Sequence, residues 1–273
     1  MKIVRFESQD DSGYGVVTPA GIVPVGQAAG PDTFAAALIA ARQVSASGAG
    51  NALPLDTVRL RPIATDSAKI LCVATNFRED KPAPDYPLTF TRFADSLVGH
   101  GEDLLKPAVS DRYDFEGELA VVIGKAGHRI SRQSALDHVA GYACFNDGSV
   151  RDWQKHSSQF IPGKNFHRSG SMGPWLVTPD EAGPFADIRL QTRVNGVVKQ
   201  EVGMDRMIFD VSWLISYFST FTPLSPGDVI ATGTPSGFGS TRVPPEFLSD
   251  GDVVEIEISG VGTLHNTVRT AAG

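Results

Sequence analysis

The apolar residues of this chain occur mostly in short alternating or unbroken runs, which are typical of β-strands. Residues 69–74 form an unbroken apolar run of the kind found in buried strands. Residues 187–194 alternate between apolar and polar side chains, and Asn195-Gly196 is a strong hairpin signal before a returning strand at 197–201. Further strands are predicted at 1–6, 14–17, 22–25, 57–63, 229–232 and 253–258. The pattern therefore predicts an α+β protein dominated by strands.

Helical spacing is confined to two longer segments. Residues 33–42 are rich in alanine, and residues 207–220 repeat apolar side chains at helical spacing with enough aromatic bulk to be largely buried. Between the first helix and the strands that follow, residues 45–51 are small and are predicted to form a linker. We therefore expect a small N-terminal α+β domain at 1–60 and a larger domain at 61–273.

Composition narrows the class of protein. The chain has 273 residues, of which 41% are hydrophobic and 20% charged, as in ordinary globular proteins. A net charge of −7 argues against nucleic acid or an anionic membrane as a partner. Cys72 and Cys144 both lie in apolar runs and are predicted to be buried thiols rather than a disulfide framework. With no signal peptide and no long apolar run, we expect a cytoplasmic protein.

Three carboxylates accompany two of the apolar runs. Glu116 and Glu118 stand two apart at the start of the run at 119–123, so a strand would place them on one face. Asp147 follows a second run at 142–145. Oxygen ligands without a His or Cys cluster suit Mg²⁺, Mn²⁺ or Ca²⁺. Such a pair is also common on solvent-facing strands, and Asn-Asp-Gly is strong turn chemistry, so the residues alone leave both interpretations open.

Longer strings around these residues resemble the fumarylacetoacetate hydrolase family. The resemblance covers most of residues 65–268, and its strings occur in order and with the right spacing. They lie at 113–125, 141–154, 162–166, 173–181, 207–239 and 251–266. The family implies a strand-dominated mixed β-sandwich roll over this region, a small N-terminal domain, and a homodimer.

The resemblance also implies a metal site. Glu116, Glu118 and Asp147 match the family's ligands for Mg²⁺ or Mn²⁺. Lys164 matches a lysine that stands beside the metal, where negative charge develops on a bound enolate. A lysine in a loop with Pro and Gly is usually solvated, so this role depends on the resemblance.

Substrate contacts are expected from two further places. In the glycine-rich loop at 232–239, the resemblance assigns Thr234 and the neighbouring amides, including that of Gly233, to a substrate carboxylate or carbonyl. Arg92 lies in an otherwise apolar, β-prone run, where an arginine usually pairs with a carboxylate. That carboxylate could belong to the substrate or to a structural aspartate.

The charged loop at 75–86 corresponds to a lid over the active site in the family. Hydrolytic members carry Asn-Tyr-x-x-His-x-x-Glu there, and the His and Glu activate water. This chain has Asp80 in place of the His and Ala83 in place of the Glu. Glu79 or Asp80 could serve as a replacement base, although a solvated charged loop explains both equally well.

Three functions compete at this stage. The first is a metal-dependent hydrolase that cleaves a C–C bond of a 2,4-diketo acid or acylpyruvate through an enolate, with a role in aromatic catabolism. The second is an isomerase, tautomerase or decarboxylase of 2-oxo or 2-hydroxymuconate-like diacids at the same site. The altered lid sequence favours this second function. The third is a protein that keeps the fold without activity, against which the retained Glu116, Glu118, Asp147 and Lys164 argue.

Overall fold

The computed structural model describes residues 1–9, 11–27, 33–47, 51–63, 68–78 and 82–271. The strands are β1 (Lys2–Glu7), β2 (Ser12–Thr18), β3 (Gly21–Gln27), β4 (Arg59–Arg61), β5 (Ile70–Val73), β6 (Thr89–Arg92), β7 (Leu97–Val98), β8 (Leu104–Lys106), β9 (Tyr113–Asp114), β10 (Gly117–Ile123), β11 (Val139–Asn146), β12 (Ser149–Val150), β13 (Gly170–Val177), β14 (Arg189–Val194), β15 (Val197–Gly203), β16 (Val229–Ala231), β17 (Val253–Ile258) and β18 (Gly262–Thr270). The α-helices are α1 (Thr33–Ser47), α2 (Arg151–Gln154), α3 (Ile161–Lys164), α4 (Pro179–Ala182) and α5 (Val211–Phe221). Short 3₁₀ helices are η1 (Leu55–Thr57), η2 (Ala94–Ser96), η3 (Ala135–His138), η4 (Phe185–Asp187), η5 (Met204–Arg206) and η6 (Gly239–Thr241).

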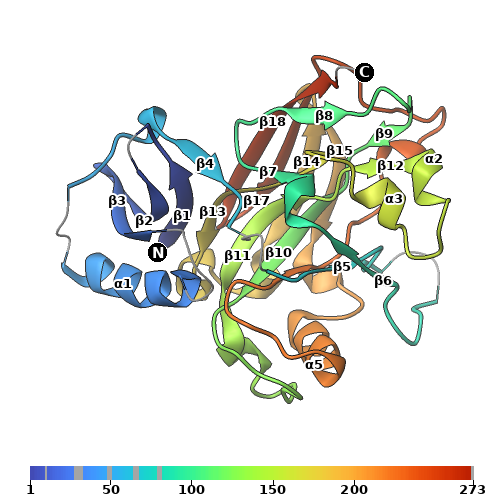
Figure 1. Ribbon diagram of the computed structural model, residues 1–273. Coiled ribbons are helices and arrows are strands. Elements are labelled where there is room, and N and C mark those ends of the chain that lie inside the picture. The colour runs from blue at the N-terminus through green and yellow to red at the C-terminus, as the bar shows by residue number, and fades with distance from the viewer. Residues whose placement is uncertain (10, 28–32, 48–50, 64–67, 79–81, 272–273) are drawn as a thin grey trace.

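Most strands belong to one large mixed sheet. Its order is β3-β2-β1-β13-β11-β10-β16-β5-β6, with β4 paired to β1 and β7 to β13 (Figure 1). A second sheet has the order β15-β14-β17-β18-β8 and packs against the central strands β10, β11 and β13. The prediction of a strand-dominated sandwich is therefore confirmed.

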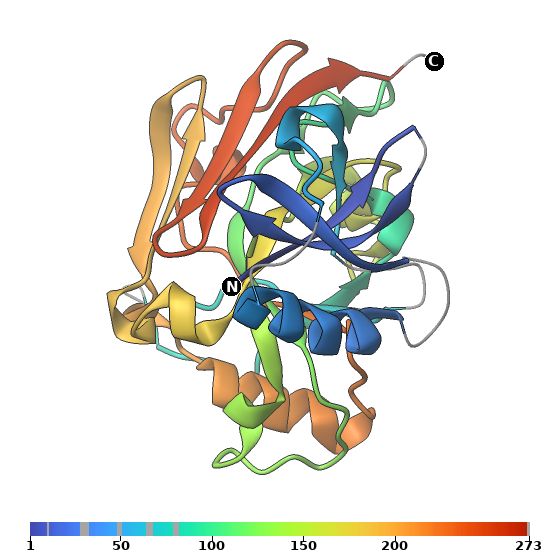
Figure 2. The same ribbon diagram turned by 90° about the vertical axis from the view of Figure 1, so that its left-hand side faces the viewer.

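The N-terminal strands extend the large sheet. Strand β1 pairs antiparallel with β13, with Lys2 opposite Val177 and Ile3 opposite Leu176. Helix α1 packs against β2 and β3 on one side of this extension (Figure 2). The boundary predicted at residue 60 therefore lies within a continuous sheet.

Strand β10 lies at the centre of the sandwich and is buried along its whole length. Leu119, Val121 and Ile123 face a core shared with the second sheet and α5, as the alternation predicted. Ala120 and Val122 face a second core, which includes residues of α1. The face that carries Glu118 is thus covered by protein as well, which removes the solvent-facing interpretation of the carboxylate pair.

Several predicted boundaries shift. The helix predicted from residue 207 begins at Val211, because Asp210 caps it by accepting a hydrogen bond from the backbone N–H of Trp213 (2.7 Å). Helix α1 continues to Ser47, into the predicted linker.

Both cysteines are buried free thiols, as expected. Within the described ranges, none of the helices has the length and apolar character needed to cross a membrane.

Candidate functional site

The three predicted carboxylates meet where β10 begins and β11 ends. The two strands are antiparallel, with Glu118 opposite Phe145, so the start of one lies beside the end of the other. Asp147 directly follows β11, and its backbone N–H donates to the carbonyl of Glu116 (2.9 Å). Glu116, Glu118 and Asp147 each place one carboxylate oxygen within 4.8 Å of the others, and all three are buried.

Buried cations neutralise two of these carboxylates. The Nζ of Lys164, at the end of α3, donates to Glu116 (2.8 Å) and to Asp147 (2.5 Å). Burial opposes the charge on Lys164, but the two carboxylates raise its pKa above the usual value. Burial alone would raise the pKa of Asp147, yet Lys164 and Arg92 hold it below its ordinary range. Lys164 therefore lies beside the acidic cluster as a permanent positive charge.

Glu118 differs from its two neighbours. Its Oε2 accepts a hydrogen bond from the backbone N–H of Gly233 (2.8 Å), but its Oε1 is buried without a partner among the described residues. Burial, followed by the charges of Asp147 and Glu116, raises the pKa of Glu118 well above its ordinary value. A buried acceptor without a donor, next to two further carboxylates, fits a hard divalent cation.

Arg92 makes its contacts inside the protein. Its guanidinium donates to Asp147 (2.7 Å), to the carbonyl of Gly148 (2.9 Å) and to the hydroxyls of Ser96 and Ser169 (3.1 and 2.9 Å). The sequence left open whether Arg92 pairs with a substrate carboxylate or with a structural aspartate, and the structure shows the pairing with Asp147. Contact with a substrate stays a prediction.

Arg151 was not predicted to be a site residue. Its sequence neighbour Asp152 accepts a hydrogen bond from Ser110, and the guanidinium of Arg151 reaches the cluster. One nitrogen, Nη1, lies 2.5 Å from Glu116, and the guanidinium lies over the ring of Phe238. Its Nη2 is buried and has no hydrogen-bond partner within the part of the chain that the structure describes. This arginine therefore keeps one free donor next to the carboxylates.

Asp114 holds Arg151 in place and was also missed. Its fully buried carboxylate accepts from Nε of Arg151 (2.8 Å) and from the backbone N–H groups of Gly239 and Ser240 (2.7 and 2.8 Å). The signal was present in the sequence, because Asp114 lies two residues before Glu116, at the spacing that had drawn attention to Glu116 and Glu118.

The glycine-rich loop is fastened to β10. The hydroxyl of Thr234 donates to the carbonyl of Gly117 (3.0 Å) and accepts from Nε2 of Gln200 (2.8 Å). Gly233 has a φ of +100°, which suits glycine, and its N–H points at Glu118. Both residues thus position Glu118, and their contact with a substrate stays a prediction. The two lid candidates, Glu79 and Asp80, lie outside the described residues.

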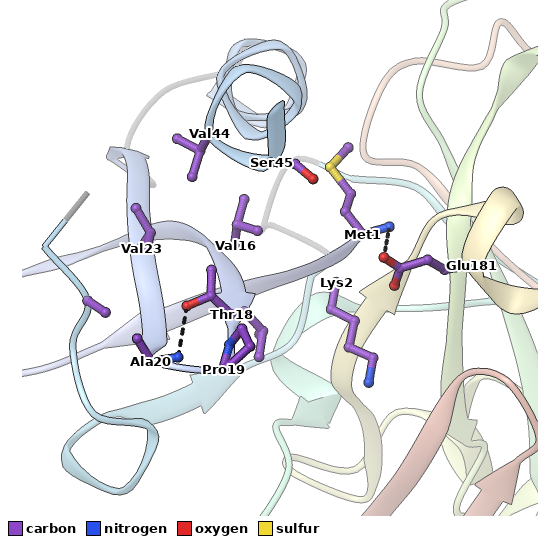
Figure 3. A pocket seen from close by; sticks show the side chains of 12 residues that line it. Met1, Lys2, Val16, Thr18, Pro19, Ala20, Val23, Val44, Ser45 and Glu181 are labelled. Atoms are coloured by element: carbon purple, nitrogen blue, oxygen red, sulfur yellow. Dashed lines mark hydrogen bonds and ion pairs between the residues drawn. The ribbon is translucent and has the colours of Figure 1, made fainter. Parts of the chain in front are cut away.

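A separate pocket of about 480 Å³ lies between the N-terminal strands, α1 and α4. Figure 3 shows Met1 and Glu181 in its wall, where the terminal amino group and the carboxylate form an ion pair of 2.8 Å. None of the predicted site residues lines this pocket, and a structural ion pair explains its charged groups.

Comparisons with known proteins agree with the geometry. A family described as "Fumarylacetoacetate (FAA) hydrolase C-terminal" matches residues 67–269. The chain is 41% identical over 224 residues to the oxaloacetate tautomerase YisK of Bacillus subtilis, covering 78% of this chain and 74% of that protein.

Two solved structures share the fold over the whole chain. One is a 5-carboxymethyl-2-hydroxymuconate delta-isomerase from Mycobacterium smegmatis, with a TM-score of 0.82 and 30% identity. The other is a fumarylacetoacetate hydrolase from Exiguobacterium antarcticum, with a TM-score of 0.84 and 33% identity. Each match covers 99% of this chain and 100% of the other. The chain is therefore an enzyme of the fumarylacetoacetate hydrolase family.

Proposed function

We propose that this protein is a divalent-metal-dependent tautomerase or isomerase of a small 2-oxo dicarboxylic acid, with oxaloacetate as the first substrate to test. The observation that supports this most is the buried cluster of Glu116, Glu118 and Asp147, in which Oε1 of Glu118 is unpaired. A tautomerase and an isomerase among the similar proteins favour this reaction over hydrolysis.

The cluster offers the ligands for Mg²⁺ or Mn²⁺. Glu116, Glu118 and Asp147 would hold the ion through one oxygen each, and the unpaired Oε1 of Glu118 would gain a partner. A cation bound there supplies positive charge that lowers the free energy of an enolate and acidifies the carbon next to a carbonyl.

Residues of the chain would bind the substrate through charge. The free Nη2 of Arg151 is a donor for a substrate carboxylate, because its other nitrogens are already held by Asp114, Gln154 and Glu116. Lys164 carries its charge within the cluster, where it stabilises negative charge on the enolate oxygen. Neither group has to be reorganised when the charge develops.

A base is needed to move the proton. In tautomerisation the base removes a proton from the carbon between the carbonyl and the distal carboxylate, and the enolate oxygen then gains a proton to give the enol. Glu79 or Asp80 of the lid loop is the proposed base, because a carboxylate suffices for proton transfer between substrate atoms. Activation of water is served less well here, since Ala83 stands where hydrolytic members carry a Glu.

Hydrolysis of a C–C bond in an acylpyruvate is the second candidate. It is supported by the similarity to a solved fumarylacetoacetate hydrolase along nearly the whole chain. The same cluster and Lys164 would stabilise the enolate that leaves, but water would have to be activated by a lid without the His and Glu pair.

Purified protein in Mg²⁺ buffer separates these functions. Oxaloacetate should interconvert between its keto and enol forms, followed by ultraviolet absorbance, faster than with the Glu118→Gln variant. Loss of the metal ligand should lower the rate by roughly three decades. Release of pyruvate from acylpyruvates, with no acceleration of tautomerisation, would instead support hydrolysis. No turnover of either substrate and no Mg²⁺ binding would contradict both enzymatic proposals.

A further inference from the structure

A second pocket is lined in part by Pro235 and Ser236 of the glycine-rich loop. It has a volume of about 440 Å³, and three arginines line it: Arg78, Arg189 and Arg206. Among the described residues, Ser236 and the acidic Glu201 belong to the same wall. In a chain with a net charge of −7, this concentration of positive charge is unusual.

The backbone fixes two of the arginines side by side. The N–H of Arg78 donates to the carbonyl of Arg206 (2.9 Å), and Nη2 of Arg206 donates to the carbonyl of Arg78 (2.9 Å). This reciprocal pair joins the segment that leads into the lid loop to η5. Like charges that line one pocket repel one another, and an anion bound among them reduces that repulsion.

The third arginine approaches from the second sheet. Arg189, at the start of β14, lies opposite Gly203 of β15, and its Nη1 is next to that glycine. Asp205 also lies beside Gly203, and Glu201 lines the pocket, so these are the two carboxylates near it within the described residues. Within the described part of the chain, no ion pair joins either of them to Arg78, Arg189 or Arg206.

We propose that this pocket is a binding site for a small anion with two negative charges, either phosphate or a dicarboxylate. Guanidinium groups present paired N–H donors that match both kinds of anion. The volume suits a small molecule rather than a chain segment. The net negative charge of the protein disfavours nucleic acid.

The site is distinct from the acidic cluster but connected to it. None of Glu116, Glu118, Asp147 and Lys164 lines the pocket. Pro235 and Ser236 line the pocket and directly follow Gly233 and Thr234 in the chain. The N–H of Gly233 donates to Glu118, and the hydroxyl of Thr234 donates to the carbonyl of Gly117. An anion in the pocket therefore lies against the same loop that orders the carboxylates, and its binding should alter the KM for the substrate.

Isothermal titration calorimetry of the 273-residue protein in EDTA buffer without Mg²⁺, which excludes binding of a dicarboxylate to a metal ion, tests this inference with inorganic phosphate and with malonate as separate probes. The Arg78→Gln, Arg189→Gln, Arg206→Gln triple variant should raise the Kd at least tenfold. The matched control replaces three other exposed arginines by Gln in the same way: Arg59, Arg112 and Arg129. These three form no ion pair in the described ranges, and the control should leave the Kd unchanged. A preference between the two probes identifies the natural ligand as a phosphate or a carboxylate compound.

The Glu118→Gln variant separates this site from the metal site. It should bind the same probe with unchanged Kd, because the pocket contains no metal ligand. Equal affinity of both triple variants for the probe would overturn the inference. So would a result in which Glu118→Gln abolishes binding of the probe and the Arg78, Arg189 and Arg206 triple variant keeps it. Because the measurement needs no turnover, its result is independent of whether the protein proves to be a tautomerase.

Discussion

Replacing Glu118 by Gln should stabilise the metal-free protein. An unpaired buried acceptor costs about 1–3 kcal/mol, and more when it is charged. The raised pKa of Glu118 means that its ionised form is less favourable in the fold than in the unfolded chain, so the free energy of unfolding falls as the pH rises through that pKa. The neutral amide of a glutamine at position 118 keeps an oxygen that accepts from the N–H of Gly233. Its NH₂ group can then donate to the carboxylates of Glu116 and Asp147. We expect a Tm higher by roughly 2–12 °C in EDTA at pH 8, from about 1–3 kcal/mol at about 2–4 °C per kcal/mol, and a smaller gain at pH 5.

The sign should reverse when Mg²⁺ is present. A ligand at one hundred times its Kd stabilises the fold by about 2.7 kcal/mol, and the variant should lose most of this gain. Scanning calorimetry of both proteins, with EDTA and with saturating Mg²⁺, gives the four Tm values needed.

Glu116→Gln is the matched control. Its two oxygens are already paired with Arg151 and Lys164, and breaking a buried ion pair costs about 3–5 kcal/mol, so the metal-free Tm should fall. If Glu118→Gln lowers the metal-free Tm as Glu116→Gln does, the reasoning about the unpaired oxygen is wrong.

Three further changes test the site. Asp114→Asn removes a charge-assisted hydrogen bond from Arg151 that is worth about 1.5–3 kcal/mol. Steady-state kinetics should therefore show a KM for oxaloacetate that is raised roughly 10–100-fold, with a smaller change in kcat. An unchanged KM would exclude Asp114 as a positioning residue. Arg151→Lys keeps the positive charge but loses the several N–H donors of the planar guanidinium, so kcat/KM should fall at least about tenfold. A kcat/KM equal to that of the wild type would show that Nη2 does not bind substrate. Mg²⁺ affinity measured by calorimetry should weaken as the pH falls, because a proton on Glu118 competes with the ion; an affinity independent of pH between about 8 and 5 would contradict this.

The sequence was most informative where local patterns determine structure. Alternation identified the strand that carries Glu118, and the apolar run before Asp147 identified its partner strand β11. Antiparallel pairing of neighbouring strands then brings the three carboxylates together without further information.

Contacts between distant segments were harder to predict. Arg151 has an acidic neighbour in the sequence, Asp152, but in the fold its guanidinium pairs with Asp114 and Glu116. The pairing depends on β9 lying against β12, a register that no short motif specifies. Thr234 and Gly233 were expected to face a substrate, and their bonds to Gly117 and Glu118 likewise depend on long-range packing.

The pairing of β1 with β13 has a practical consequence for protein engineering. The family match begins at residue 67, so a fragment cut there would retain the acidic cluster but lose β1. The backbone of β13 near Leu176 and Val177 would then present unpaired N–H and C=O groups along a hydrophobic border. Exposed strand borders of this kind recruit other chains, so such a fragment should aggregate even though its chemistry is intact.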